Sequence, residues 1–594
     1  MIAEQLQQLV SDSLVKSSLE FKGKILIEKP ADKSHGDFST PVALQMAREI
    51  GKNPREVATQ IANNLEKGDT IESVEIAGPG FVNFRLSKKV LEDRILEVKK
   101  KKEKFGRGAT LKGKKIMIEF AHPNTHKAFH IGHLRNISLG ESLVRIIKSQ
   151  GAKTFRANYQ GDIGLHVAKC LWGYGQSTEK IGDDATPQQK AEFLGKVYAI
   201  GGKAFEVDEK ARAEIYAINK KIYSRDPEIV PLWEKTRKWS LEYFDYIYKR
   251  LGTHFDRLFF ESEVFELGKN LVEKFKAKGV FEDSQGAVIF PGEKYGLHSR
   301  VFITKDGNAT YEAKEMGLAK LEREAFKFDK AIHVVANEQA DYLKVTFKAM
   351  DCLFPGILQK QFHLSYGMVN LTTGKMSSRT GDVITAEALI NEAREKIGEI
   401  VAGSKLSTEE KELAIEKVAV GALKFTMLFT NAKSDIAFDI NKAVKLDGDS
   451  GAYLQYAYAR ICSITEKVKS KNKPNFGAFN DADWDLARCL NMFEYTVAKA
   501  AEELSPHGIA HYLLDLAGEF SKWYAVNTVK DAEGGLKPAR LELIKAVAQV
   551  IKNGLELLGI EVVEKMGAQR KVVFRTTASL RNTIKPDCVC NLLI

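Results

Sequence analysis

The chain has 594 residues, of which 44% are hydrophobic and 28% charged, and its formal net charge is +11. At about 150 residues per domain, this length predicts about four domains in an ordinary globular protein. No stretch approaches the ~18 consecutive apolar residues of a membrane span, and the first residues lack the layout of a secretory signal. Collagen, disorder, membrane insertion and a disulfide scaffold are therefore excluded. The basic charge favours a polyanionic partner such as nucleic acid.

The six cysteines are scattered and form no C-x-x-C pair. A structural zinc ribbon therefore has little support, and we expect neither zinc nor another resident metal. Reduced thiols in a cytoplasmic protein are the simplest interpretation.

The N-terminal unit is predicted to span residues 1–110. Apolar residues recur at helical spacing from Leu6 and again from Val42, and GPGFVNFRL (78–86) ends a short strand pattern. The basic segment 99–108 is predicted to be a solvated helix end followed by a linker.

Residues 111–400 are predicted to form an α/β core. KKIMIEF (114–120) has the pattern of a strand, and AIHVVAN (331–337) and HLSYGMVNL (363–371) are further strand candidates separated by helical sequence. Strands that alternate with helices predict a parallel sheet. The charged, mostly helical stretch at about 170–290 is predicted to be an insertion in this core.

Residues 401–566 show helical periodicity throughout and are predicted to form a bundle. One apolar stripe has the spacing 3-4-3-4-3, and its members are Leu541, Ile544, Ala548, Ile551, Leu555 and Leu558. Residues 567–594 lose this pattern and form a basic tail outside the bundle.

Two motifs carry the chemistry. His130-Ile131-Gly132-His133 begins a helix directly after a strand, so both histidines share one face of a helix N-terminus, which attracts phosphate. Lys375-Met376-Ser377-Ser378-Arg379 follows a predicted strand, and its cations and hydroxyls suit a pyrophosphate leaving group. The chain has neither a complete G-x-x-x-x-G-K-[ST] nor G-x-G-x-x-G after a strand, which excludes P-loop and dehydrogenase chemistry.

With these motifs the sequence resembles the class I aminoacyl-tRNA synthetases, and specifically the arginyl-tRNA synthetase family. SHGDF and GPGFVNF resemble that family's N-terminal domain, and EFAHPNTHKAFHIGHLRN and NYQGDIGLHVAK resemble its catalytic core. GDSGAYLQYAYARICSI (448–464) and NGLELLGIEVVEKM (553–566) resemble its helical anticodon-binding domain. The resemblance covers roughly residues 1–566 in order.

The resemblance implies a Rossmann-like parallel-sheet core with a helical insertion, a small α+β N-terminal domain and an all-α C-terminal bundle. It implies ATP, supplied with Mg²⁺, as a substrate, and a two-step reaction through arginyl-adenylate that requires tRNA for activation. The residues that would contact ATP are His130, Gly132, His133, Met368, Val369, Lys375, Met376, Ser377 and Ser378. Ser378 replaces the second lysine of the family's loop motif, and Lys127 is expected to supply the missing phosphate charge.

The arginine side chain calls for carboxylates in fork geometry. By family position, the residues that would line this pocket are Glu119, Asn124, Tyr311, Glu315 and Gln339. Tyr311 and Glu315 are spaced i, i+4 and share a face if helical. Glu315 stands where the family more often has aspartate, and pairing on a charged helix is the alternative role for it.

For tRNA(Arg), the resemblance assigns recognition to the two ends of the chain, and the candidates are Phe81, Asn83, Tyr453, Tyr456, Tyr458 and Arg460. Aromatic side chains with arginine suit unstacked bases, although burial in the core is the alternative for each aromatic residue. A monomer is expected. The rival functions are a cysteine-specific class I synthetase, a non-catalytic tRNA-binding paralogue and a small-molecule nucleotidyltransferase.

Overall fold

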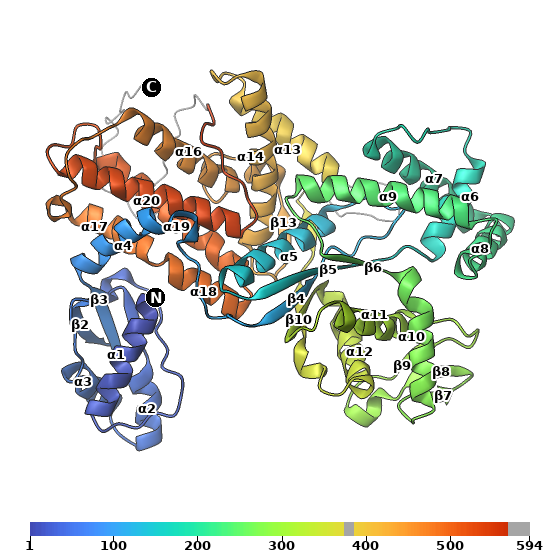
Figure 1. Ribbon diagram of the computed structural model, residues 1–594, viewed down its shortest axis with the longest axis horizontal. Helices are drawn as coiled ribbons and strands as arrows, with labels where there is room; N and C mark the ends of the chain where they lie inside the picture. The colour runs from blue at the N-terminus through green and yellow to red at the C-terminus, as the bar shows by residue number, and fades with distance from the viewer. Residues whose placement is uncertain (373–384, 568–594) are drawn as a thin grey trace.

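The computed structural model describes residues 1–372 and 385–567, and its domains lie side by side in one elongated molecule (Figure 1). Lys375, Met376, Ser377 and Ser378 lie outside the described residues, as does the tail from residue 568. Within the described ranges, no helix is both long enough and apolar enough to cross a membrane.

The N-terminal end of the chain folds as a three-stranded antiparallel sheet with three helices. The strands lie in the order β1-β3-β2. The elements are α1 (Ile2–Lys16), β1 (Phe38–Thr40), α2 (Val42–Ile50), α3 (Pro54–Asn63), β2 (Ile71–Ala77) and β3 (Phe81–Leu86). The helices predicted from Leu6 and Val42 are confirmed, because both residues are fully buried on α1 and α2.

Helix α4 (Lys88–Lys101) leaves this sheet and packs against α17 (Asp481–Asn491) and α20 (Leu536–Leu557) of the C-terminal bundle (Figure 1). Its Arg94 forms a buried ion pair with Glu494. The basic helix end is exposed as predicted, but Phe105 behind it is buried, and Gly106 has φ +91° and lies against the Phe493 ring. The linker is therefore anchored on the bundle rather than solvated along its whole length.

The core is a five-stranded parallel sheet in the order β11-β10-β4-β5-β6. Its strands are β4 (Lys115–Glu119), β5 (Lys153–Gln160), β6 (Arg257–Phe260), β10 (Lys330–Ala336) and β11 (Gln361–Tyr366), and α5 (Ile131–Ser149) connects β4 to β5. The predicted α/β core is confirmed. All five strands run the same way, so their carboxyl ends meet at one edge, where ligands of open α/β sheets bind.

One predicted strand is wrong in extent. The segment 363–371 breaks after Tyr366, and β12 (Val369–Leu371) pairs instead with β13 (Ile436–Phe438) in a separate parallel pair. The break is at Gly367, where a Cβ atom would lie 2.7 Å from the Ser434 backbone. Only glycine allows this close approach of the two segments.

Two lobes interrupt the sheet, where the sequence predicted one helical insertion (Figure 1). The helical lobe lies between β5 and β6 and contains α6 (Leu165–Gln176), α7 (Pro187–Val207), α8 (Glu209–Tyr223) and α9 (Val230–Arg250). The second lobe carries a small antiparallel sheet that the sequence did not predict. Its elements are α10 (Glu261–Lys276), β7 (Glu282–Ser284), β8 (Ala287–Phe290), β9 (Arg300–Ile303), α11 (Tyr311–Ala325) and α12 (Ala340–Leu353).

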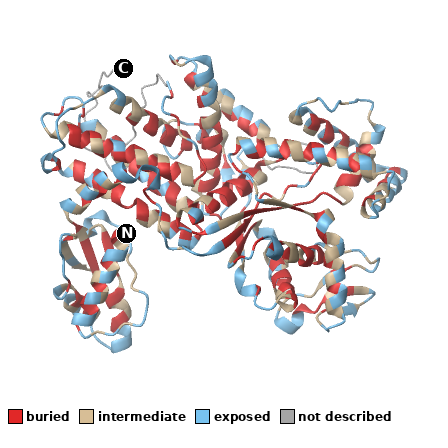
Figure 2. Ribbon diagram, viewed as in Figure 1, coloured by how far each residue is buried: buried red, intermediate tan, exposed pale blue. Residues whose placement is uncertain are grey.

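The C-terminal part is helical as predicted except at β13, which the sequence did not predict. Besides α17 and α20, it contains α13 (Ala386–Val401), α14 (Thr408–Phe429), α15 (Ile440–Ala443), α16 (Gly451–Lys467), α18 (Phe493–Glu503) and α19 (Pro506–Val526). The predicted apolar stripe lies on α20 and at its end, and all six members are buried against the bundle (Figure 2).

Deletion of residues 568–594 should leave the melting temperature and the enzymatic activity of the protein nearly unchanged. The apolar stripe ends at Leu558, and Met566 is the last buried apolar residue of the described chain. Thermal unfolding and activity of the truncated protein test this prediction, and a large loss of soluble protein would contradict it.

Candidate active site

The histidine motif lies at the N-terminus of α5, at the carboxyl edge of the sheet. His130 is the N-cap residue, and its Nδ1 accepts a hydrogen bond from the Gly132 N–H at 3.1 Å, while His133 Nδ1 accepts one from the His130 N–H at 3.1 Å. The two rings lie 3.9 Å apart. A Cβ atom on Gly132 would lie 2.9 Å from the His130 ring, so this position must be glycine for His130 to cap the helix.

Both histidines are neutral near pH 7. Burial, and then the charge of Lys127, lowers the pKa of His130, and burial with the neighbouring histidine lowers the pKa of His133 well below its usual value. Because Nδ1 is the acceptor in each ring, we assign the proton to Nε2 in both. The motif therefore presents two Nε2–H donors beside a helix N-terminus, an arrangement that binds phosphate oxygens.

The loop that precedes the motif is held in an uncommon backbone conformation. Ala121, His122 and His126 have φ values of +82°, +48° and +64°, a region that non-glycine residues rarely adopt. The His126 ring bridges the hydroxyls of Thr125 (2.9 Å) and Thr236 (2.8 Å) and anchors the loop to α9 of the helical lobe. The sequence motif included His126 but did not indicate this contact.

Lys127 lies on the same loop, beside the helical lobe. Its Nζ is 5.5 Å from the centre of the Tyr198 ring on α7, and burial lowers the pKa of Lys127. Within residues 1–372 and 385–567, Lys127 forms no ion pair, so its ammonium has no carboxylate partner there. A cation without a carboxylate beside the two histidines is available for an anionic ligand.

A cluster of buried acidic side chains, called the acidic pocket below, lies at the same edge of the sheet, where β4 ends. Glu119 Oε2 is 2.7 Å from His333 Nδ1, and Glu119 Oε1 is 3.3 Å from His122 Nδ1. Burial opposes ionisation of Glu119, but the charge of His333 and its hydrogen bond lower the pKa of Glu119 to about 2. Both oxygens of this carboxylate are thus engaged by protein groups.

Glu315 is the less engaged carboxyl group of the pocket. It lies on α11, and burial, followed by the charge of Glu119, raises the pKa of Glu315 to about 8, although a hydrogen bond from Tyr342 opposes the rise. A guanidinium ion would remove this electrostatic cost, because an opposite charge favours the ionised carboxylate.

Several buried polar atoms around this pocket have no partner within the described chain. They include Tyr159 Oη and His122 Nε2. Such atoms are uncommon in folded proteins and call for a ligand or water. Five residues of this site were not predicted, because their types and spacing carry no local signal of a shared site: Tyr159, His122, Glu322, His333 and Tyr342.

The other predicted arginine contacts lie at the start of α11 and beyond the ends of β4 and β10. Tyr311 is the first residue of α11, is 67% exposed, and lies 4.9 Å from Lys314 Nζ, which is paired with Glu261 at 2.9 Å. Asn124 is exposed and forms a parallel bridge with Gly161 at the end of β5. Gln339 is exposed in a 3-10 turn after β10.

Arg135 connects the motif helix to the β12–β13 pair. It is fully buried, and its guanidinium donates to the carbonyls of Gly367 (2.8 Å), Met368 (3.0 Å), Ala432 (2.9 Å) and Ser434 (2.7 Å). Burial lowers the pKa of Arg135 to about 10. The guanidinium thus joins the backbone at the Gly367 break to the segment 432–434 that lies against it.

The two predicted backbone contacts to adenine differ in availability. The Met368 N–H donates to Asp435 at 2.7 Å, and its carbonyl accepts from Ile436 at 2.8 Å, so its backbone groups are already used. Val369 is the register partner of Ile436. In a parallel ladder the N–H and C=O groups of such a residue point away from the partner strand, so those of Val369 face the side of β12 opposite β13. Val369 remains the better candidate for a backbone contact.

The predicted tRNA contacts are mostly buried. Asn83 is 4% exposed on β3 and Phe81 is half-buried; Tyr453 and Tyr458 are core residues of α16, and the Tyr453 hydroxyl lies 3.0 Å from Ser521 Oγ. For Asn83, Tyr453 and Tyr458 the structure therefore gives no surface from which to read a base. Tyr456 and Arg460 are half-buried, and Arg460 lies 5.0 Å from the Tyr524 ring.

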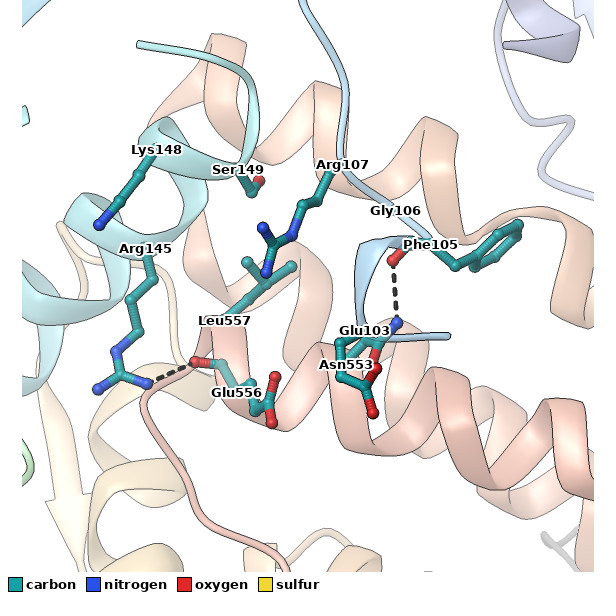
Figure 3. Close-up of a pocket in the computed structure, with 10 residues that line it drawn as sticks. All are labelled: Glu103, Phe105, Gly106, Arg107, Arg145, Lys148, Ser149, Asn553, Glu556 and Leu557. Carbon is teal, nitrogen blue, oxygen red and sulfur yellow. Dashed lines mark hydrogen bonds between the residues drawn. The ribbon is translucent and has the colours of Figure 1, made fainter. Parts of the chain in front are cut away.

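A separate cavity of ≈ 240 Å³ lies at the other end of α5 (Figure 3). Arg107, Arg145 and Lys148 line it together with α20, and Arg145 donates to the Glu556 carbonyl at 3.1 Å. At 1.5 Å per residue, the length of α5 separates this cavity from His130 by roughly 25 Å, so it is not part of the site above. Within residues 1–372 and 385–567, no group of three or more His, Cys, Asp or Glu is arranged to hold a metal ion.

The chain is similar to known protein families over almost its whole length. Residues 94–440 match the family "tRNA synthetases class I (R), catalytic domain", residues 454–566 the "DALR anticodon binding domain", and residues 4–86 the "Arginyl tRNA synthetase N terminal domain". An arginine–tRNA ligase of Treponema denticola is 34% identical over 590 aligned positions, and the match covers 94% of this chain and 99% of the relative. One of Borrelia hermsii is 33% identical over 95% of this chain and 99% of the relative.

Solved structures show the same fold. The Thermus thermophilus arginyl-tRNA synthetase superposes with a TM-score of 0.82 at 24% identity, and covers 95% of this chain and 100% of its own. The Plasmodium falciparum arginyl-tRNA synthetase superposes with a TM-score of 0.76 at 20% identity, and covers 95% and 99%. The predicted fold class is confirmed.

Proposed function

This chain belongs to the arginyl-tRNA synthetase family, and we propose from that premise how its own residues carry out the ligation of arginine to tRNA. The arginine carboxylate attacks the α-phosphate of ATP, which gives arginyl-adenylate and pyrophosphate. The terminal adenosine hydroxyl of tRNA then attacks the acyl carbon, which releases AMP. Little covalent chemistry is required of the protein, so positioning and charge stabilisation dominate.

The observation that carries the proposal is the meeting of two groups at one sheet edge. The neutral His130 and His133, with Nε2–H donors at the α5 N-terminus, suit the triphosphate. The carboxyl group of Glu315 beside Glu119 suits a guanidinium. ATP and arginine bound to these groups would lie next to each other above the carboxyl ends of β4 and β5.

Each residue then has a distinct part in the first step. His130 and His133 donate to phosphate oxygens, and Lys127 offsets the charge that builds on the phosphates in the transition state. Val369 contacts adenine through its backbone, in a segment that Arg135 holds in place. Lys375, Met376, Ser377 and Ser378, outside the described residues, are proposed to contact the leaving pyrophosphate.

Arginine recognition is assigned to Glu315 as the direct guanidinium partner, with Tyr311 on the same face of α11. Asn124 and Gln339 are proposed to contact the main-chain groups of the amino acid from the neighbouring strand ends. The two carboxyl groups favour a permanent cation, which explains why arginine is the expected substrate among the twenty amino acids.

The KM for arginine should rise as the pH falls below about 8. The pKa of Glu315 in the unliganded protein is about 8, and only the ionised carboxylate pairs with the guanidinium. Arginine affinity is therefore full above this pH and falls by about tenfold per unit below it. Aminoacylation measured at saturating ATP between pH 6 and pH 9 tests this prediction, with the KM for ATP as the control. A KM for arginine that is constant from pH 6 to pH 8 would contradict it.

Different parts of the chain are proposed to bind different substrates. The proposed tRNA(Arg)-binding parts are residues 1–110 and 401–566, where Tyr456 and Arg460 on α16 are the more accessible of the predicted contacts. ATP and arginine would bind to residues 111–400. The net charge of +11 supports a polyanionic partner. The enzyme is proposed to act as a cytoplasmic monomer, to use Mg²⁺ with ATP, and to hold no zinc.

One assay tests the function as a whole. Purified protein is incubated with ATP, total tRNA and each of the twenty amino acids in turn. Charging with arginine alone is the expected result. Charging with cysteine would favour the rival synthetase, and charging with none would favour a non-catalytic paralogue.

A further inference from the structure

A row of buried polar side chains lies behind the acidic pocket. Glu322 on α11 hydrogen-bonds to Glu119 on β4, and Glu119 hydrogen-bonds to His333 on β10 at 2.7 Å. His333 in turn contacts Gln361 Oε1 on β11 at 2.5 Å through Nε2. Glu119, His333 and Glu322 are 4%, 3% and 1% exposed, so water does not screen these contacts.

The geometry determines where the protons lie. Two carboxyl groups in hydrogen-bond contact share one proton, so Glu322 is neutral and donates to the ionised Glu119. His333 faces an oxygen acceptor at each ring nitrogen, which makes both nitrogens donors and the ring an imidazolium. The pKa directions of both residues agree with this assignment. Burial and the charge of Glu119 raise the pKa of Glu322 well above its usual value. Glu119 also raises the pKa of His333, although burial opposes the rise.

The other titratable groups near Glu119 are either neutral or already paired, which leaves His333 as its cationic partner. His122, on the loop after β4, is neutral because burial lowers its pKa. Lys314 on α11 is already paired with Glu261 at the end of β6. Tyr159 on β5 and Tyr342 on α12 stay protonated, because burial raises the pKa of each well above its usual value. His333 is therefore the cation in direct contact with Glu119.

We propose that His333 is a positioning residue for amino-acid recognition, which keeps Glu119 ionised and in a fixed orientation behind Glu315. The inference rests on the proposed arginine pocket. Without the imidazolium, Glu119 would take up a proton or turn away, and the pocket would lose the fixed negative charge that attracts a guanidinium. Glu322 supports the same orientation as a neutral donor, so its hydrogen bond matters more than its charge.

Replacement of His333 by glutamine tests the proposal in the full-length enzyme with tRNA. Without the imidazolium, burial and the neighbouring carboxyl groups should raise the pKa of Glu119 toward the ~8–9 known for buried glutamates. His333→Gln should therefore raise the KM for arginine about tenfold at pH 7, with kcat and the KM for ATP changed less than about threefold. The defect should shrink as the pH rises from 7 to 9, because Glu119 then ionises without help. A purely structural role would give no such recovery with pH.

His363→Gln is the matched control. His363 is the register partner of His333 on β11, but its Nε2 contacts the Val335 carbonyl at 2.9 Å and not Glu119. The KM for arginine of this variant should equal that of the unmodified enzyme at every pH between 7 and 9. An equal effect of both substitutions, or an unchanged KM for arginine in His333→Gln, would overturn the proposal.

Substitutions at Glu322 keep the test decisive if His333→Gln folds poorly. Glu322→Gln retains a donor to Glu119 and should raise the KM for arginine less than Glu322→Ala does. A rise for Glu322→Gln at least as large as that for Glu322→Ala would mean that the retained donor does not matter, and would overturn the proton assignment. Charging of arginine by the unmodified enzyme in the same assay separates the two claims, because its absence would refute the proposed function rather than the role of His333.

Discussion

Replacement of Glu315 by alanine should raise the KM for arginine by roughly 10²–10³, with a much smaller effect on the KM for ATP. Truncating one partner of a buried charge pair costs about 3–5 kcal/mol, which corresponds to a change of this size in affinity. Glu315 is assigned the direct contact because both Glu119 oxygens are held by His333 and His122, whereas the hydrogen bond to Glu315 comes from Tyr342. Steady-state aminoacylation kinetics with varied arginine measure the effect.

Two further substitutions separate charge from shape at this position. Glu315→Gln keeps size and hydrogen bonding but removes the charge, so it should retain little of the arginine affinity. Glu315→Asp should retain most of it, because the charge survives and only the reach changes. A near-normal KM for arginine in Glu315→Gln would show that Glu315 is an ordinary helix acid, and Glu119 would then have to bind the guanidinium itself.

Replacement of Lys127 by alanine should lower the rate of adenylate formation by about 10²–10³ and change arginine affinity far less. One donor to transition-state phosphate charge contributes about 2.7–4 kcal/mol. Lys127 is available for this role, since its ammonium lies over the Tyr198 ring and pairs with no carboxylate of the described residues. Single-turnover measurements with tRNA present would report this step directly.

Lys169 provides the matched control for this substitution. It also places its ammonium over an aromatic ring, 4.0 Å from the centre of Phe205, but in the helical lobe. Lys169→Ala should leave the rate within about threefold. Lys375→Ala should resemble Lys127→Ala, and the double variant should be less than additive if both lysines grip the same phosphates. Strict additivity would point to separate roles.

Local sequence determined the type and place of most secondary elements. A strand followed by His130 at a helix N-cap, the apolar stripe of α20, and the i, i+4 spacing of Tyr311 and Glu315 on α11 were all predicted. These features repeat over one or two turns of helix, so the sequence records them directly. The family resemblance then placed ATP and arginine chemistry at these positions.

Periodicity states which face of an element is buried, but not what lies against it. Docking of α4 on the bundle, the break between β11 and β12, and the burial of Tyr453 depend on partners far along the chain. The second lobe and its small sheet escaped prediction for the same reason, because its strands are only three or four residues long.

The sequence, with its family resemblance, predicted His130, His133, Lys127, Glu119 and Glu315 as the groups for this chemistry. Only the tertiary structure decided their states. Glu119 meets His333, 214 positions away, because β4 and β10 are neighbours in the parallel sheet, and no local pattern records such a pairing. Burial in that sheet then decides which carboxyl is ionised and which holds a proton, since the cost of a buried charge depends on its neighbours in space.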